Sequence, residues 1–139
     1  MRYWDASAIV PLIINEAAAP VIGVDVKSPM VVWWGTIVEA ASAIARRERA
    51  GALSGGQVMH CFNLLQELAT GWLEVPPSDE LRRTAQRLLR VHALRAADSL
   101  QLAAALTFAA DRYSSVDFVC RDARLSEAAA REGLKVIAA

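Results

Sequence analysis

Short apolar runs alternate with longer helix-forming segments along this chain of 139 residues. Five runs have a composition that suits strands, at residues 1–4, 30–34, 72–75, 116–120 and 135–138. A strand followed by a helix usually pairs in parallel with a later strand, because the helix carries the chain back to the starting edge of the sheet. The alternation therefore predicts one α/β domain over the whole chain, with a parallel sheet covered by helices on both faces.

Serines precede several of the helical segments and glycines follow others, as is usual at helix N-caps and C-termini. They are Ser7, Ser54 and Ser78 before the helices, and Gly51, Gly71 and Gly133 after them. The expected helices cover residues 8–15, 37–50, 54–71, 78–92, 93–111 and 123–132. The segment VIGVDV at 21–26 fits either a helix or a strand, because a short apolar run cannot be assigned from its period alone.

The composition excludes several classes of protein. With 55% hydrophobic and 22% charged residues, the chain is too apolar for a disordered protein. No apolar run reaches the ~20 residues that a membrane-spanning helix needs, and no signal peptide opens the sequence, so we expect a cytoplasmic protein. Cys61 and Cys120 lack the spacing of a metal site and are too few for a disulfide scaffold, so we expect two reduced thiols.

The charges balance, because 15 basic residues face 15 acidic ones. Proteins that hold nucleic acid mainly through its phosphates usually carry a basic excess. That excess is absent overall, although arginines cluster within 46–49 and 82–90. The overall charge therefore neither requires nor excludes a nucleic-acid substrate.

Four acidic residues are expected near one edge of the sheet. Asp5 follows the first strand, Asp122 follows the strand at 116–120, and Glu39 lies in the first turns of the helix after 30–34. Asp98 lies near the start of its helix, where the helix dipole favours a negative charge. Ligands of open parallel sheets bind beyond the carboxyl ends of the strands, so these acids can meet in one site.

Acids gathered in this way suit a divalent cation. Carboxylates a few ångströms apart need either raised pKa values or a cation. Mg²⁺ and Mn²⁺ prefer oxygen ligands, and they activate water and stabilise the charge on a phosphate during hydrolysis. The sequence contains no GxSxG, HExxH or P-loop motif that would indicate another chemistry.

Each acid taken alone also fits a purely structural role. Asp5 can cap the first helix together with Ser7, Asp98 can pair with Arg95, and Glu39 can lie on a solvated helix face. These alternatives stay open at the level of local sequence.

Four segments together resemble a PIN domain, and most closely the VapC-type ribonuclease toxins of toxin–antitoxin pairs. They are WDASAIVPLI, TIVEAASAIARRERAG, LRAADSLQLAAAL and FVCRDARLSEAAAREGL. The resemblance covers essentially the whole chain and implies a five-stranded parallel sheet with helices on both sides. It also implies Mg²⁺- or Mn²⁺-dependent cleavage of RNA, with transfer or ribosomal RNA as frequent targets. A usually homodimeric toxin bound by a VapB-type antitoxin, in a heterotetramer or a larger complex, is implied as well.

The resemblance assigns roles residue by residue. Asp5 lies in the D-x-S opening and Glu39 in the T-x-x-E motif, while Asp98 and Asp122 match the third and fourth acids. It implies that Asp5 and Asp98 anchor the metal, that Glu39 completes the site directly or through water, and that Asp122 orients a second ion or the attacking water.

Two polar residues accompany the first two acids, and one position departs from the family pattern. Ser7 and Thr36 match the polar residues that go with Asp5 and Glu39. Cys120 stands where the family commonly has a threonine, two residues before the fourth acid. This difference weakens the expected support for Asp122.

Three other functions are compatible with parts of the sequence. A receiver-type phosphoacceptor is disfavoured, because its aspartate and lysine are missing at the ends of the third and fifth strands. An antitoxin-binding module without activity would use an apolar groove, for which Trp34 is the candidate, and would reach DNA only through the antitoxin. A PIN nuclease in RNA processing would keep the chemistry without the toxin role.

Overall fold

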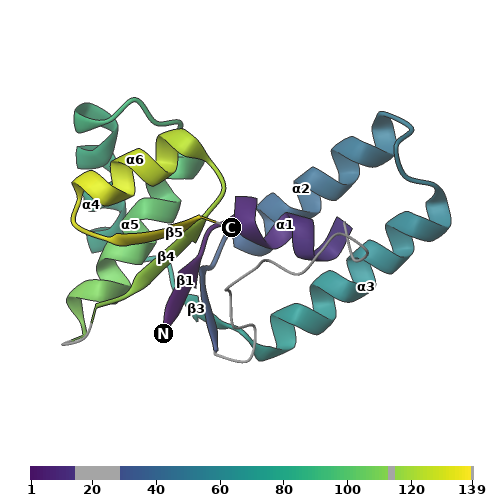
Figure 1. The fold of residues 1–139 in the computed structure, drawn as a ribbon, viewed down its shortest axis with the longest axis horizontal. Coiled ribbons are helices and arrows are strands. Elements are labelled where there is room, and N and C mark those ends of the chain that lie inside the picture. The colour runs from purple at the N-terminus through teal and green to yellow at the C-terminus, as the bar shows by residue number, and fades with distance from the viewer. Residues whose placement is uncertain (15–28, 113–114, 139) are drawn as a thin grey trace.

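The chain forms an α/β fold around a five-stranded parallel sheet in the computed structural model, which describes residues 1–14, 29–112 and 115–138 (Figure 1). The strands are β1 (Arg2–Trp4), β2 (Met30–Trp33), β3 (Leu73–Val75), β4 (Asp117–Cys120) and β5 (Lys135–Ala138). The helices are α1 (Ala6–Ile14), α2 (Thr36–Arg49), α3 (Gly55–Gly71), α4 (Asp79–Val91), α5 (Ala96–Ala110) and α6 (Ala123–Arg131). The predicted fold class and the parallel pairing are confirmed.

The strand order places the two ends of the chain in the middle of the sheet. The order is β3-β2-β1-β4-β5, and every neighbouring pair is parallel. The chain builds β2 and β3 on one side of β1 and then returns to build β4 and β5 on the other side. The strand order therefore reverses at β1, and a ligand site is expected beyond the carboxyl ends of β1 and β4.

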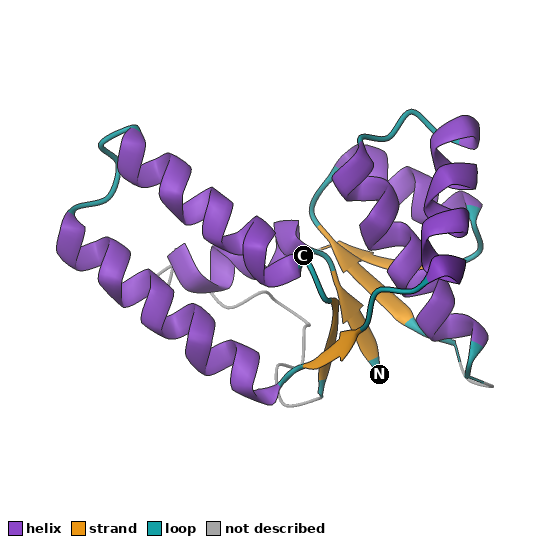
Figure 2. Ribbon diagram, turned by 180° about the vertical axis from the view of Figure 1, so that it is seen from behind, coloured by secondary structure: helices purple, strands orange, loops and turns teal. Residues whose placement is uncertain are grey.

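The side chains of the strands alternate between two cores, one on each face of the sheet. Tyr3 packs with residues of α4, α5 and α6, whereas Trp4 packs with residues of α1, α2 and α3. Figure 2 shows these two groups of helices on either side of the strands. Trp33 and Trp72 are buried as well, so the expected core role of three tryptophans is confirmed. None of the helices in the described ranges combines the length and apolar character needed to cross a membrane.

The helix boundaries differ from the prediction at two places. The first helix begins at Ala6 rather than at residue 8, so Ser7 lies inside the helix and is not its N-cap. The helix predicted for 93–111 begins only at Ala96, because His92 and Arg95 are extended. Ser54 and Ser78 cap α3 and α4 as expected. The ambiguous segment 21–26 lies outside the described residues.

Candidate active site

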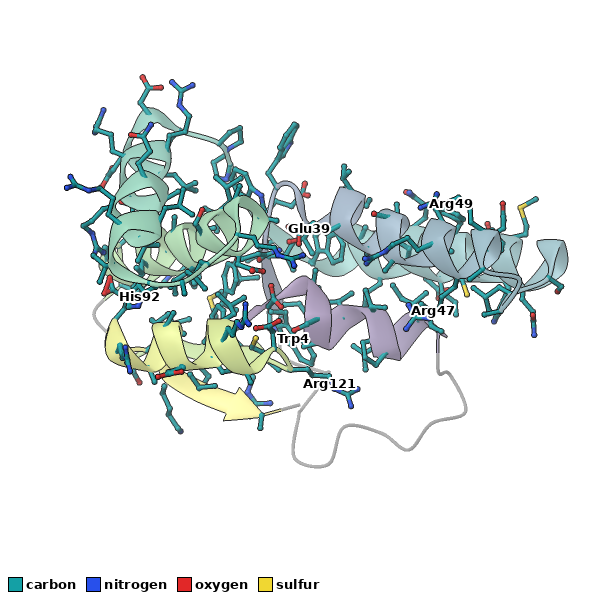
Figure 3. All side chains as sticks on the ribbon, turned by 90° about the horizontal axis from the view of Figure 1, so that it is seen from above. Trp4, Glu39, Arg47, Arg49, His92 and Arg121 are labelled. Atoms are coloured by element: carbon teal, nitrogen blue, oxygen red, sulfur yellow. The ribbon has the colours of Figure 1, made fainter. Side chains whose placement is uncertain are left out.

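All four predicted acids line one open cleft of about 850 Å³ at the carboxyl edge of the sheet. They come from four different places: Asp5 after β1, Glu39 on α2, Asp98 on α5 and Asp122 after β4. Figure 3 looks onto this edge and shows Glu39 centrally, where the two halves of the molecule meet. The structure thus brings together carboxylates that are up to 117 residues apart in sequence.

Asp5 is fixed by the end of its own strand. Its backbone N–H donates to the Val119 carbonyl at 3.0 Å, which extends the β1–β4 ladder by one residue. Its Oδ2 accepts the Ser7 N–H at 2.9 Å, so the carboxylate satisfies a free donor at the start of α1. Only 4% of the residue is exposed, and burial raises the pKa of Asp5 despite this bond. The proposed capping role of Asp5 is therefore real, and it holds a carboxylate at the floor of the cleft.

Glu39 is held by a buried hydrogen-bond relay that sequence reasoning did not assign to the site. The Tyr3 hydroxyl donates to Gln101 Oε1 at 2.8 Å, and Gln101 Nε2 donates to Thr36 Oγ1 at 2.9 Å and to Glu39 Oε1 at 3.0 Å. Tyr3, Thr36 and Gln101 are all fully buried. Thr36 therefore supports Glu39 through Gln101 and one turn of α2.

The environment of Glu39 makes it hard to ionise. Burial raises the pKa of Glu39 to about 7, and the negative charges of Asp5 and Asp98 act in the same direction. The hydrogen bond from Gln101 opposes this shift, because it stabilises the carboxylate. The glutamate is half-buried and faces the cleft, so it does not lie on a solvated face.

Asp98 and Asp122 occupy the starts of two helices on the opposite side of the cleft. Asp98 is the third residue of α5, and a hydrogen bond from the Arg95 backbone favours its charged form. Burial and the neighbouring Asp122 nevertheless raise the pKa of Asp98. Asp122 is the N-cap of α6, and its Oδ1 accepts the Leu125 N–H at 2.9 Å. Both acids thus combine a helix-end position with exposure to the cleft.

Cys120 connects three of the site residues from the end of β4. Its Sγ lies 3.7 Å from Asp5 Oδ2 and 3.6 Å from Ser7 Oγ, and it accepts the Asp122 N–H at 3.3 Å. Ser7 Oγ in turn accepts the Arg121 N–H at 3.0 Å. Burial, and then the charge of Asp5, raise the pKa of the Cys120 thiol to about 11. The neutral thiol therefore supports this corner of the site through the contacts that a hydroxyl would make, and both cysteines are free.

The donor set fits Mg²⁺ or Mn²⁺, although the carboxylates are not drawn tightly together. In the described part of the chain, none of the four acids has a basic partner within 4.0 Å. Three of them have raised pKa values, which is the electrostatic situation that a bound cation relieves. No three His, Cys, Asp or Glu side chains of residues 1–14, 29–112 and 115–138 form a ready-made ligand cluster. This arrangement suits an ion that keeps several waters and binds through one or two carboxylates.

Comparisons with known proteins inform the fold alone. No family model matches the sequence, and no curated protein matches it. Among solved structures, the chain is similar to the crystal structure of PAE2754 from Pyrobaculum aerophilum, with a TM-score of 0.66. The two sequences are 19% identical over 98% of this chain and 89% of the other. The similarity agrees with a PIN-like α/β architecture.

Proposed function

We propose that this protein is a metal-dependent endoribonuclease of the PIN type that acts as the toxin of a VapC-type toxin–antitoxin pair. The observation that carries the proposal is the convergence of four carboxylates without basic partners, from four separate elements, on one open cleft. Acids that only capped helices or paired with arginines would have no reason to share a cleft. The sequence motifs around these acids support the family assignment.

Each acid has a role that follows from its surroundings. Asp5 and Asp98 would hold Mg²⁺ or Mn²⁺ from opposite walls of the cleft, with Glu39 and Asp122 completing the site directly or through water. The bound ion would supply an activated water and neutralise charge on the phosphate. Asp5 is kept in place by the Ser7 N–H and Glu39 by Gln101, so the acids are oriented before any ligand arrives.

Glu39 can couple cation binding to proton release. With a pKa of about 7, it is half protonated at neutral pH when the cleft holds no cation. A divalent cation favours the carboxylate, so its binding should release part of a proton. The same acid is then available as a charged ligand or as an acceptor for a proton of cleft water.

The biological setting of the proposal rests on the family resemblance. The substrate would be RNA, with transfer or ribosomal RNA as the first targets to test, and the protein would act in the cytoplasm. A VapB-type antitoxin would cover the cleft, and a homodimer would bind the antitoxin in a heterotetramer or a larger complex. Any contact with DNA would come from the antitoxin.

The decisive experiment is cleavage of a total RNA pool by the purified protein with Mg²⁺, Mn²⁺ or EDTA. Wild type is compared with Asp98→Asn, and with Asp79→Asn as a matched control. Asp79 is exposed on α4 and pairs with Arg82, outside the cleft. Discrete cuts that need the metal, disappear in Asp98→Asn and persist in Asp79→Asn are expected. Equal cutting by all three proteins, or none with any metal, would refute the nuclease.

A further inference from the structure

The cleft has an exposed tryptophan in its wall. Trp34 is 56% exposed, whereas each of the other three tryptophans is at most 8% exposed. Trp34 lines the same cleft as the four acids. Large aromatic side chains bury much apolar area when they can, so one held open beside a polar site points to a ligand with a flat apolar face.

The position of Trp34 is fixed by its backbone and by its neighbours. Its N–H donates to the Val75 carbonyl at 3.1 Å, which ties the residue to the end of β3. Its ring meets the buried Trp33 ring edge to face, with centroids 6.3 Å apart and planes at 70°. A Cβ at Gly35 would lie 2.5 Å from Trp33 Nε1, so a glycine is needed where the chain turns into α2. Trp34 is therefore presented to the cleft by a tightly packed turn.

Beyond the acids, the same wall of the cleft becomes basic. Val38, Glu39, Ser42, Arg46 and Arg47 line it at intervals of three and four residues, which is one face of α2. Arg46 lies seven residues after Glu39, about 10 Å farther along the helix axis. Figure 3 shows Arg47 farther out along the molecule than Glu39.

These two arginines are available to an anionic ligand. Within the described ranges, neither has an acidic partner within 4.0 Å. An arginine that lines a cleft and is not neutralised by a neighbour can contact a phosphate. The wall thus offers an aromatic ring, then carboxylates, then two cations.

We propose that this wall binds a single strand of RNA, with an unpaired base stacked on Trp34 and the phosphates of the same strand at Arg46 and Arg47. The inference rests on the proposed nuclease and names the conformation of its substrate. A base inside a duplex has both faces covered by its neighbours, so the indole can stack only on a base that is unpaired or at an end. The arginine pair favours a phosphate-bearing strand over an apolar helix of a protein partner as the occupant.

Binding without cleavage tests this inference directly. The full-length Asp98→Asn protein is titrated with a single-stranded oligoribonucleotide and with the duplex of the same sequence, and tryptophan emission and its quenching by acrylamide are followed. Because the other tryptophans are buried, acrylamide reaches mainly Trp34. The single strand should lower the emission and protect it from acrylamide, and the duplex should do neither.

Three variants in the same background separate stacking from general apolar contact. Trp34→Leu should weaken binding of the single strand by about 5- to 150-fold, because one stacked base contributes roughly 1–3 kcal/mol. Trp34→Tyr should restore most of the affinity, because it keeps a flat ring. Leu73→Ala removes another exposed apolar side chain, 47% exposed and outside the cleft, and should bind like the parent protein.

Unchanged emission with the single strand, together with parental affinity of Trp34→Leu, would overturn the inference. So would equal affinity for strand and duplex, or a response of Trp34 only to a protein partner. The nuclease is judged separately. Metal-dependent cutting by wild type with no role for Trp34 would leave the proposed function intact, and stacking without cutting by any metal would refute the nuclease alone.

Discussion

Replacing Gln101 by methionine should both destabilise the fold and alter Glu39. The side chain is fully buried and makes three hydrogen bonds, to Tyr3, Thr36 and Glu39. A hydrogen bond contributes about 1 kcal/mol net, and a buried polar group left without a partner costs about 1–3 kcal/mol. Methionine has a similar volume and leaves the two buried hydroxyls without this partner. We therefore expect Gln101→Met to lower the free energy of unfolding by about 2–4 kcal/mol.

Urea unfolding measures this loss, with Gln66→Met on the exposed face of α3 as the matched control. The control should change the free energy of unfolding by less than about 0.5 kcal/mol. Tyr3→Phe should show coupling to Gln101→Met, so the double variant should lose less than the sum of the two single losses. A loss below about 0.5 kcal/mol in Gln101→Met, or additive effects in the double variant, would refute the relay as a stabilising network.

Three other outcomes follow from the same site. In EDTA, the raised pKa of Glu39 should make stability fall as pH rises from about 4.5 to about 7, because the folded state binds the extra proton in that window; Glu39→Gln should remove this part of the pH dependence, and an unchanged profile would contradict it. At pH 8, Mg²⁺ or Mn²⁺ should raise the melting temperature of wild type, by an amount equivalent to about 2.7 kcal/mol at 100 times Kd, and much less for Asp5→Asn; equal shifts would argue against a site at Asp5. At pH 8 the folded protein should resist iodoacetamide at Cys120 and Cys61, because both thiols are buried, and both should react in urea; rapid labelling of the folded protein, detected by mass spectrometry, would disprove this.

The sequence pattern predicts the kinds of element better than their limits or order. The alternation of strands and helices is visible because apolar runs and helical segments differ in length and composition. The break between α4 and α5 was missed, since His92, Ala93 and Leu94 carry no glycine or proline to mark it. Leu94 packs against the core, so tertiary contacts set that boundary. The strand order depends on contacts between distant segments, which no local pattern contains.

The site shows the same division between local and long-range information. The four acids were placed correctly at one edge, because the carboxyl ends of parallel strands meet there. Tyr3 and Gln101 were not assigned a role, since each gains it only from a partner about a hundred residues away. One signal was present: Gln101 follows Asp98 by three residues in an otherwise apolar stretch, so it lies on the same face of α5.

The central position of β1 has a consequence for the order in which the protein becomes active during its synthesis. β1 is made first, but its neighbour β4 and the acids Asp98 and Asp122 are made in the last third of the chain. The cleft therefore cannot exist on a nascent chain that lacks its C-terminal part. For an enzyme that attacks cellular RNA, this topology keeps the growing polypeptide harmless to the ribosome and transfer RNAs that are making it, until translation is almost complete.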